Sequence, residues 1–215
     1  MRDIDLVIFD CDGVLIDSEG LSGAVLIEAL REVGVFIDFD DFCVRMVGRS
    51  FPTVAAEIRE VHGTRLPEGF EATYRARLLT RFEADLRVTD GIEAVLDALN
   101  MPSCVATSSS PARVRRSLEL TGLCKRFDQV FTASEVTRGK PAPDLFLHAA
   151  ARMGADPARC LVIEDSLPGI EAARTAGMRM LRYTGGAHLR GRTLKHAPDV
   201  VAFDDWRAFA SMVAA

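Results

Sequence analysis

Short runs of mainly apolar residues recur along the chain between longer segments of mixed polarity. These runs lie at residues 6–9, 104–106, 129–131, 161–163 and 178–181. Continuous apolar runs of this length are typical of strands that are buried on both faces, as in a parallel sheet covered by helices. The pattern therefore predicts strands of such a sheet at these positions.

Segments of helical period separate the apolar runs in the second half of the chain. Residues 111–120 follow Ser110 as a candidate N-cap, and this helical pattern ends before Gly122. Ser166 precedes a second candidate helix that ends at Gly177. From residue 90 onward helices and strands alternate, which favours the α/β class with a doubly wound parallel sheet.

The stretch from residue 17 to residue 87 breaks this alternation. It lacks strong strand runs and shows helical patterns over 21–33, 51–61 and 71–82. Because it separates the first strand from the others, we interpret it as a helical module inserted into a sheet domain. The expected division is an α/β core of residues 1–16 and 88–215 and a helical cap of residues 17–87.

The composition is that of an ordinary globular protein. The chain has 215 residues, of which 48% are apolar and 27% charged, enough for one core and a small second module. The net charge of −5 gives no indication of a nucleic-acid partner. The five cysteines form no Cys-x-x-Cys pair and are interpreted as reduced thiols. With no signal sequence or membrane span in the sequence, we expect a cytoplasmic monomer or small homo-oligomer without a membrane partner.

Several predicted strands end on polar residues that suit chemistry. Asp10 follows the first strand, Thr107 the second, and the pair Glu164 and Asp165 ends a later one. Ligands of open α/β sheets bind beyond the carboxyl ends of the strands. These residues, although distant in the sequence, are therefore expected to share one rim of the sheet.

Asp10 and Asp12 belong to an Asp-x-Asp-Gly motif, in which Gly13 permits a turn. Two carboxylates this close do not ionise independently unless a cation separates their roles. Asp165, with Glu164 beside it, offers opposing oxygens, and such all-oxygen ligation suits Mg²⁺. We interpret Asp10 as a nucleophile that forms an aspartyl phosphate, and Asp12 as the group that exchanges the proton. The alternative is a turn with two solvated or capping aspartates.

Two further segments carry groups that suit a phosphate. In Thr-Ser-Ser-Ser-Pro at residues 107–111, the hydroxyls of Thr107 and Ser108 and the backbone N–H groups at a helix start can hold an anion. Plain N-capping by Ser110 is the alternative. Lys140 stands in a proline-rich loop, where a fixed ammonium would stabilise a transferring phosphoryl group. A solvated surface lysine is the alternative there.

Other polar and aromatic residues are interpreted without a functional role. Arg113, Arg115 and Arg116 are expected on one solvated helix face, and Trp206 is expected in the core. Four histidines are dispersed and predict neither a catalytic triad nor a zinc site: His62, His148, His188 and His196.

Taken in order, these motifs resemble those of the haloacid dehalogenase superfamily, in its branch of β-phosphoglucomutase and small sugar-phosphate phosphatases. The motifs stand at residues 9–14, Thr107, Lys140 and 164–169, with Gly177 in the expected place after them. The resemblance covers essentially the whole chain. It implies an α/β core with a helical cap inserted after the first strand.

The resemblance also implies a ligand set for Mg²⁺. In this family the first aspartate, the backbone carbonyl of the second and the late acidic pair hold the metal. Carried over to this sequence, the ligands are Asp10, Asp12 and Asp165, with Glu164 as a further or outer ligand.

Departures from the family pattern narrow the expected reaction. Dehalogenase members do not use the second aspartate, so the presence of Asp12 favours phosphoryl chemistry. Phosphonoacetaldehyde hydrolases need a cap lysine, but no lysine precedes Lys125. Ser22 stands where β-phosphoglucomutase has a cap histidine, and Val47-Gly48 where it has Lys-Gly. These differences favour simple hydrolysis over the mutase reaction.

One cap segment bears on the substrate. The segment at residues 48–51 resembles the family's substrate loop, in which Arg49 would contact an anionic group of the substrate. With Glu19, it resembles phosphatases that act on sugar phosphates such as 6-phosphogluconate, although a surface arginine in a turn is an equal alternative for Arg49. We therefore expect a Mg²⁺-dependent phosphatase of a small phosphorylated metabolite, such as a sugar phosphate. A β-phosphoglucomutase-like phosphomutase and a catalytically silent phosphate-binding protein remain the alternatives.

Overall fold

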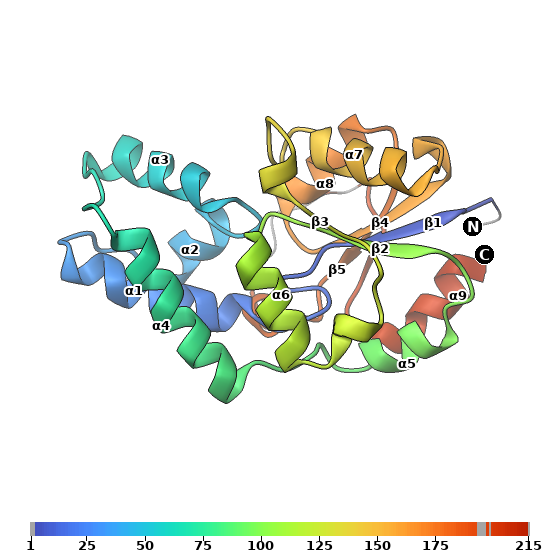
Figure 1. The fold of residues 1–215 in the computed structure, drawn as a ribbon, viewed down its shortest axis with the longest axis horizontal. Helices are drawn as coiled ribbons and strands as arrows, with labels where there is room; N and C mark the ends of the chain where they lie inside the picture. Colours follow the sequence, from blue (N-terminus) through green and yellow to red (C-terminus); the bar gives the residue numbers. More distant parts are fainter. Residues whose placement is uncertain (1–2, 193–196, 198, 215) are drawn as a thin grey trace.

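A six-stranded parallel sheet forms the centre of the larger part of the molecule (Figure 1). The structure, a computed structural model, describes residues 3–192, 197 and 199–214. Within these residues the sheet has the order β3-β2-β1-β4-β5-β6, which is a doubly wound order, so the predicted fold class is confirmed. The strands are β1 (Leu6–Phe9), β2 (Ser103–Thr107), β3 (Val130–Thr132), β4 (Cys160–Glu164), β5 (Arg179–Tyr183) and β6 (Ala202–Phe203).

Helices cover both faces of the sheet. Successive side chains of a strand point to opposite faces, so continuous apolar strands make both faces apolar. In β1, Val7 and Phe9 join one apolar cluster, while Leu6 and Ile8 join the other. The first face packs against α5 (Ile92–Ala98), α6 (Pro111–Leu120) and α9 (Phe209–Ala214). The second face packs against α7 (Asp144–Met153) and α8 (Leu167–Thr175), which lie together on the other side of the sheet (Figure 1).

Four helices between β1 and β2 form a separate group beside the sheet (Figure 1). We call this group the helical unit: α1 (Glu19–Glu32), α2 (Phe39–Arg45), α3 (Phe51–His62) and α4 (Phe70–Asp85). Apolar side chains from all four helices are buried in it, among them Leu30, Phe42, Ile58 and Phe82. The chain enters and leaves this unit through two neighbouring segments, where Asp17 N–H donates to the carbonyl of Arg87 at 2.9 Å.

Two of the elements that the apolar pattern did not predict are α2 and β6. The seven-residue helix α2 is too short to show a clear helical period, and a capping box between Asp38 and Asp41 fixes its start. The strand β6 has only two residues, so its sequence cannot be distinguished from that of a loop. Among the described residues, no helix is both long and apolar enough to cross a bilayer.

Trp206 is fully buried, as expected, and connects the C-terminal segment to the sheet. Its ring stacks on Tyr183 with ring centres 4.7 Å apart and lies 6.2 Å from the ring of Phe9. Its indole N–H donates to Thr89 Oγ1 at 3.0 Å, and that hydroxyl donates to the carbonyl of Val14 at 2.6 Å. Trp206 therefore supports the loop that follows β1.

Replacing Trp206 with alanine should lower the free energy of unfolding by about 3–5 kcal/mol, because it removes a large buried ring and one hydrogen bond. Urea denaturation followed by circular dichroism measures the loss. Phe36→Ala is the matched control: this ring is 72% exposed, so its loss should change stability by less than about 0.5 kcal/mol. Equal losses in the two variants would contradict the packing described here.

Candidate active site

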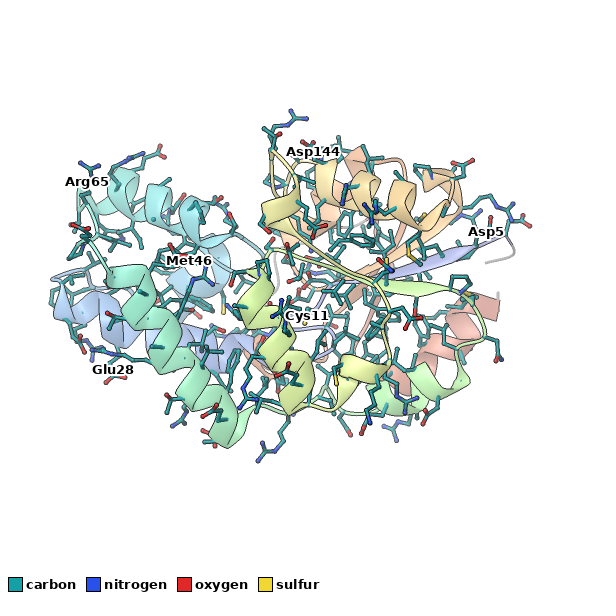
Figure 2. The ribbon with its side chains drawn as sticks, in the orientation of Figure 1. Asp5, Cys11, Glu28, Met46, Arg65 and Asp144 are labelled. Atoms are coloured by element: carbon teal, nitrogen blue, oxygen red, sulfur yellow. The ribbon has the colours of Figure 1, made fainter. Side chains whose placement is uncertain are left out.

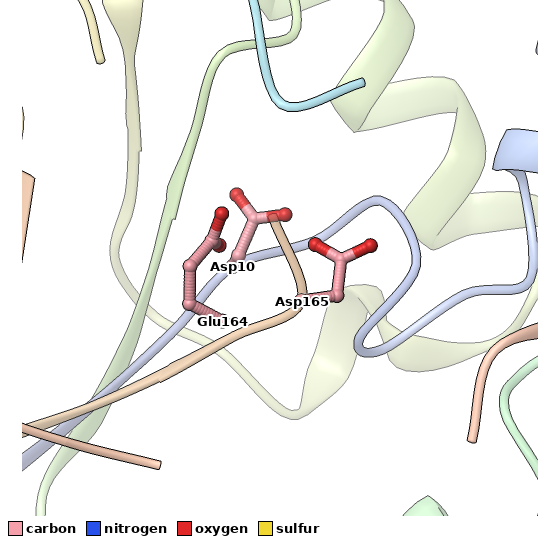
Figure 3. A group of neighbouring side chains, drawn as sticks. All are labelled: Asp10, Glu164 and Asp165. Carbon is pink, nitrogen blue, oxygen red and sulfur yellow. The ribbon is translucent and has the colours of Figure 1, made fainter. Parts of the chain in front are cut away.

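Asp10, Glu164 and Asp165 meet where β1 and β4 end. Figure 3 shows the three carboxylates side by side, Asp10 from the loop after β1 and the other two from the end of β4. One oxygen from each residue lies within 4.8 Å of the others, and all three residues are buried. In a doubly wound sheet this is the point at which the strand order reverses, where ligands bind.

Lys140 lies against this acidic group, and its side chain is completely buried rather than solvated. Its ammonium is 2.6 Å from Asp10 Oδ1 and 3.4 Å from Glu164 Oε2, and it donates to the carbonyl of Ala106 at 3.2 Å. Burial lowers the pKa of Lys140, but the charges of Asp10 and Glu164 outweigh that effect and raise the pKa overall. The lysine is therefore a permanent positive charge in the site.

One ammonium does not neutralise three carboxylates. Burial, followed by the charge of Glu164, raises the pKa of Asp10 well above its ordinary value. Burial likewise raises the pKa of Glu164 to about 7, although Lys140 opposes the shift. The site therefore favours either bound protons or a bound cation.

The acidic group fits a hard divalent cation. Its donors are carboxylate oxygens, which such cations prefer. Asp165 Oδ2 is buried and accepts no hydrogen bond within the described residues, although the imidazole Nε2 of His188 lies 3.0 Å from it. The loop after β1 approaches closely because Gly13 has a φ of +80°, and a Cβ there would lie 2.1 Å from Asp165 Oδ2. Gly13 thus leaves the space that the carboxylate occupies.

Asp12 lies beside the acidic group but is held by different partners. Ser18 Oγ and Arg113 Nη2 donate to its Oδ1 at 2.6 and 2.7 Å, and Ser109 Oγ donates to its Oδ2 at 2.6 Å. Burial raises the pKa of Asp12, but Arg113 and the two hydroxyls lower it overall. Both side-chain oxygens already accept hydrogen bonds, which agrees with the backbone carbonyl of Asp12 as the metal ligand that the family resemblance implies.

A cavity of about 110 Å³ lies between the helical unit and the sheet, with Asp10 and Asp12 in its wall. Cys11, which stands between these two aspartates, lies where the helical unit meets the sheet part (Figure 2). Thr107 and Ser108 also line the cavity, on the side of β2. Ser108 Oγ donates to the carbonyl of Gly48 at 2.9 Å and so connects the two parts of the molecule.

Arg49 and Glu19 reach the same cavity from the helical unit. Arg49 Nη1 lies 3.5 Å from Glu57, and its buried Nε has no hydrogen-bond partner among the described residues. Burial, followed by the charge of Asp12, raises the pKa of Glu19 to about 8. The cavity wall therefore offers a positively charged group and a carboxyl that is neutral near pH 7.

The structure corrects the interpretation of Arg113. We expected it on a solvated face with Arg115 and Arg116, but its guanidinium points inward and is paired with Asp12. The sequence pattern could not show this, because the surface that covers Arg113 comes from the distant helical unit. His188 was also missed: its buried Nε2 lies 3.0 Å from Asp165 Oδ2, and this carboxylate raises the pKa of His188 against the opposing effect of burial. His196 lies outside the described residues.

Comparison with known proteins adds an independent finding. A family model for haloacid dehalogenase-like hydrolases matches residues 4–177. The chain is 28% identical to 6-phosphogluconate phosphatase of Escherichia coli over 190 residues, which cover 87% of this chain and 86% of that protein. It is 35% identical to fructose-1-phosphate phosphatase of the same organism over 178 residues, which cover 80% of this chain and 92% of the relative.

A solved structure shares the whole architecture. A conserved haloacid dehalogenase-like protein of unknown function from Agrobacterium tumefaciens superposes with a TM-score of 0.82 and 32% sequence identity. The match covers 98% of each chain. The resemblance therefore includes both the sheet and the helical unit.

Adding Mg²⁺ to cation-free protein should raise its melting temperature, and the rise should be larger at pH 8 than at pH 5. The cation binds carboxylates, whereas burial raises the pKa of Asp10 and Glu164 in the cation-free site, so protons compete increasingly as the pH falls. At a hundredfold excess over Kd, binding should contribute about 2.7 kcal/mol.

Differential scanning calorimetry after EDTA treatment measures this effect. Asp165→Asn should abolish most of the Mg²⁺-dependent rise, while Asp128→Asn, at an exposed position, should retain it. A rise that is independent of pH, or that survives in Asp165→Asn, would argue against a cation at this group.

Proposed function

Because this chain belongs to the haloacid dehalogenase-like hydrolase family, we propose that it is a Mg²⁺-dependent phosphatase that works through an aspartyl-phosphate intermediate. The family and the enzyme class predicted from the sequence, a phosphoric monoester hydrolase, are confirmed by the matches to this family and its phosphatases. The observation that supports the mechanism is that the two aspartates have different hydrogen-bond and ion-pair partners. Asp10 faces Lys140 and the acidic group, while Asp12 is held apart by Arg113 and two serines.

In the proposed first step, a carboxylate oxygen of Asp10 attacks the phosphorus of the substrate. The bond between phosphorus and the ester oxygen breaks, and the protonated form of Asp12 gives its proton to that oxygen. The products are a free alcohol, an aspartyl phosphate on Asp10 and an ionised Asp12. Lys140, together with Thr107 and Ser108, binds the charged phosphoryl oxygens in this proposal.

In the proposed second step, Asp12 accepts a proton from a water molecule that attacks the same phosphorus. The bond between phosphorus and Asp10 breaks, which releases inorganic phosphate and restores the Asp10 carboxylate. Asp12 is again protonated and ready for the next substrate. The three donors around Asp12 lower its pKa and so favour the ionised form, which accepts the proton in the second step. The acid form used in the first step requires the negative charge of the bound phosphate to raise that pKa.

Mg²⁺ would be held by Asp10, Asp165 and the backbone carbonyl of Asp12, with Glu164 as a further or outer ligand. When bound, it would neutralise charge on the acidic group and on the phosphoryl oxygens. The pairing of Glu164 with Lys140 and Ser166 supports an outer position for this residue.

We propose a small phosphorylated metabolite, such as a sugar phosphate, as the substrate. The relatives named above are phosphatases of 6-phosphogluconate and fructose 1-phosphate. A cavity of about 110 Å³ suits a small leaving group, and Glu19 and Arg49 in its wall suit hydroxyl and anionic groups. Residues 17–87 would act as a cap over this cavity and keep out bulk water.

Because all five cysteines are free thiols, we place the enzyme in the cytoplasm.

The phosphomutase alternative has less support at residue 22, where β-phosphoglucomutase has a histidine and this chain has a serine. Ser22 Oγ accepts a hydrogen bond from Arg113, and no histidine is available there to exchange a proton with a sugar hydroxyl. A bisphosphorylated sugar should therefore be hydrolysed rather than prime an isomerisation, which phosphorus NMR of the products distinguishes. The intact pair of aspartates also argues against a silent phosphate-binding protein.

Asp10→Asn should abolish hydrolysis of p-nitrophenyl phosphate, because the amide is a poor nucleophile toward phosphorus. Asp12→Asn should lower the turnover of fructose 1-phosphate by about 10²–10⁴-fold, the usual contribution of general acid–base catalysis. Phosphate release measures both rates, and EDTA should stop the reaction of the unchanged enzyme. Asp128→Asn, at an exposed position, should keep full activity. Near-normal turnover of any phosphate monoester by Asp10→Asn would refute the proposed mechanism.

Arg49→Ala should raise the KM for 6-phosphogluconate by about tenfold or more, because a hydrogen bond to a charged group contributes about 1.5–3 kcal/mol. The KM for p-nitrophenyl phosphate, which has no second anionic group, should change little. Arg45→Ala is the matched control, since Arg45 also pairs with Glu57, at 3.0 Å, but does not line the cavity. A similar KM increase in both variants would assign Arg49 to structure rather than to substrate binding.

A further inference from the structure

Arg113 differs from the neighbouring arginines of α6 in what its side chain contacts. Its side chain is 17% exposed, whereas that of Arg116 is 42% exposed. One nitrogen, Nη2, donates both to Asp12 Oδ1 at 2.7 Å and to Ser22 Oγ at 3.0 Å. The guanidinium carbon also lies over the ring of Phe82, 5.3 Å from its centre.

These contacts join two parts of the molecule. Ser22 belongs to α1 and Phe82 to α4, both in the helical unit, whereas Asp12 follows β1 and Arg113 lies on α6. The two hydrogens of a single guanidinium nitrogen serve one partner on each side. The position of the helical unit and the orientation of Asp12 are therefore connected through one group.

The other two donors to Asp12 constrain it less. Ser18 and Ser109 contribute hydroxyls, which rotate and can also accept hydrogen bonds. Arg113 is a planar, permanently charged donor, and its hydrogen bond to a carboxylate is about twice as strong as a neutral one. Without Arg113, the carboxylate of Asp12 would keep two neutral partners and lose its charged one.

We propose that Arg113 is a positioning residue. It holds the carboxylate of Asp12 in the orientation for proton transfer when the helical unit packs against the sheet domain. Enclosure of the substrate and alignment of the acid–base group are then a single event. Arg113 cannot exchange the proton itself, because a guanidinium does not lose its proton in proteins. The inference rests on the proposed function, in which Asp12 exchanges a proton with the leaving oxygen and with water.

The choice of leaving group tests this role. Nitrophenolate departs without a proton, whereas the alkoxide of fructose 1-phosphate needs one, so only the second ester depends on an aligned acid. Comparison of kcat/KM isolates the first transfer, to Asp10. Arg113→Ala should lower kcat/KM about 100-fold for fructose 1-phosphate, the effect of a displacement near 1 Å, but less than about tenfold for p-nitrophenyl phosphate.

Matched variants separate positioning from general stability. Arg116→Ala also removes an ion pair to the helical unit, to Glu83 at 2.7 Å. This pair is exposed and does not include Asp12. It should leave both kcat/KM values within about twofold. Ser22→Ala should show the same dependence on the leaving group as Arg113→Ala, with a smaller loss. Arg113→Lys should recover part of the activity toward fructose 1-phosphate, because it restores a charged donor.

Added guanidinium chloride at millimolar concentration should restore activity toward fructose 1-phosphate to Arg113→Ala but not to Ser22→Ala. Equal losses with the two substrates, together with failure of guanidinium to rescue, would overturn the assignment of Arg113. That outcome is distinct from failure of the proposed function, which would appear as retained turnover in Asp10→Asn or Asp12→Asn. Should Arg113→Ala prove unfolded by circular dichroism, the same comparison with Arg113→Lys and Arg113→Gln decides the question.

Discussion

Three buried carboxylates meet at the ends of β1 and β4, two of them in contact with one buried ammonium, and the charge that remains governs the rest of the site. Removing a carboxylate from water costs several kcal/mol even after relaxation, and Lys140 compensates for only one of the three. The consequence is visible in Asp10 and Glu164, whose pKa values are raised by burial. A divalent cation would resolve this conflict, and in the proposed mechanism it would allow Asp10 to remain an ionised nucleophile beside an anionic substrate.

The fold brings these acidic residues together at the ends of two neighbouring strands, where small residues leave space for their side chains. β1 and β4 are adjacent and parallel, so the residues after them emerge side by side. Small residues then leave room for the acidic side chains: a Cβ on Gly169 would lie 1.9 Å from Glu164 Oε1. The helical unit adds a second wall, and its contacts at Ser108 and Arg113 join it to the loops that carry the chemistry.

Much of this could be predicted because the signals are local. Asp10 and Asp165 each follow an apolar run, and the parallel sheet required by such runs brings their strand ends together. Arg113 was misinterpreted because a polar helix face looks the same whether water or another helix covers it, and only the folded helical unit decides between them. His188 and β6 lie in a region of short elements, where no period distinguishes buried from exposed residues.

Other positions show where sequence and structure each contribute. Taken alone, Lys140 suited a surface lysine as well as a phosphate ligand, and the other motifs favoured the second interpretation. The structure places its side chain entirely inside the site.

Covalent labelling of Asp10 tests the central claim most directly. Acid quenching during turnover of fructose 1-phosphate, followed by peptide mass spectrometry, should find a phosphoryl group on Asp10. A phosphoryl group on another residue, or none at a time when a burst of alcohol has been released, would contradict the account.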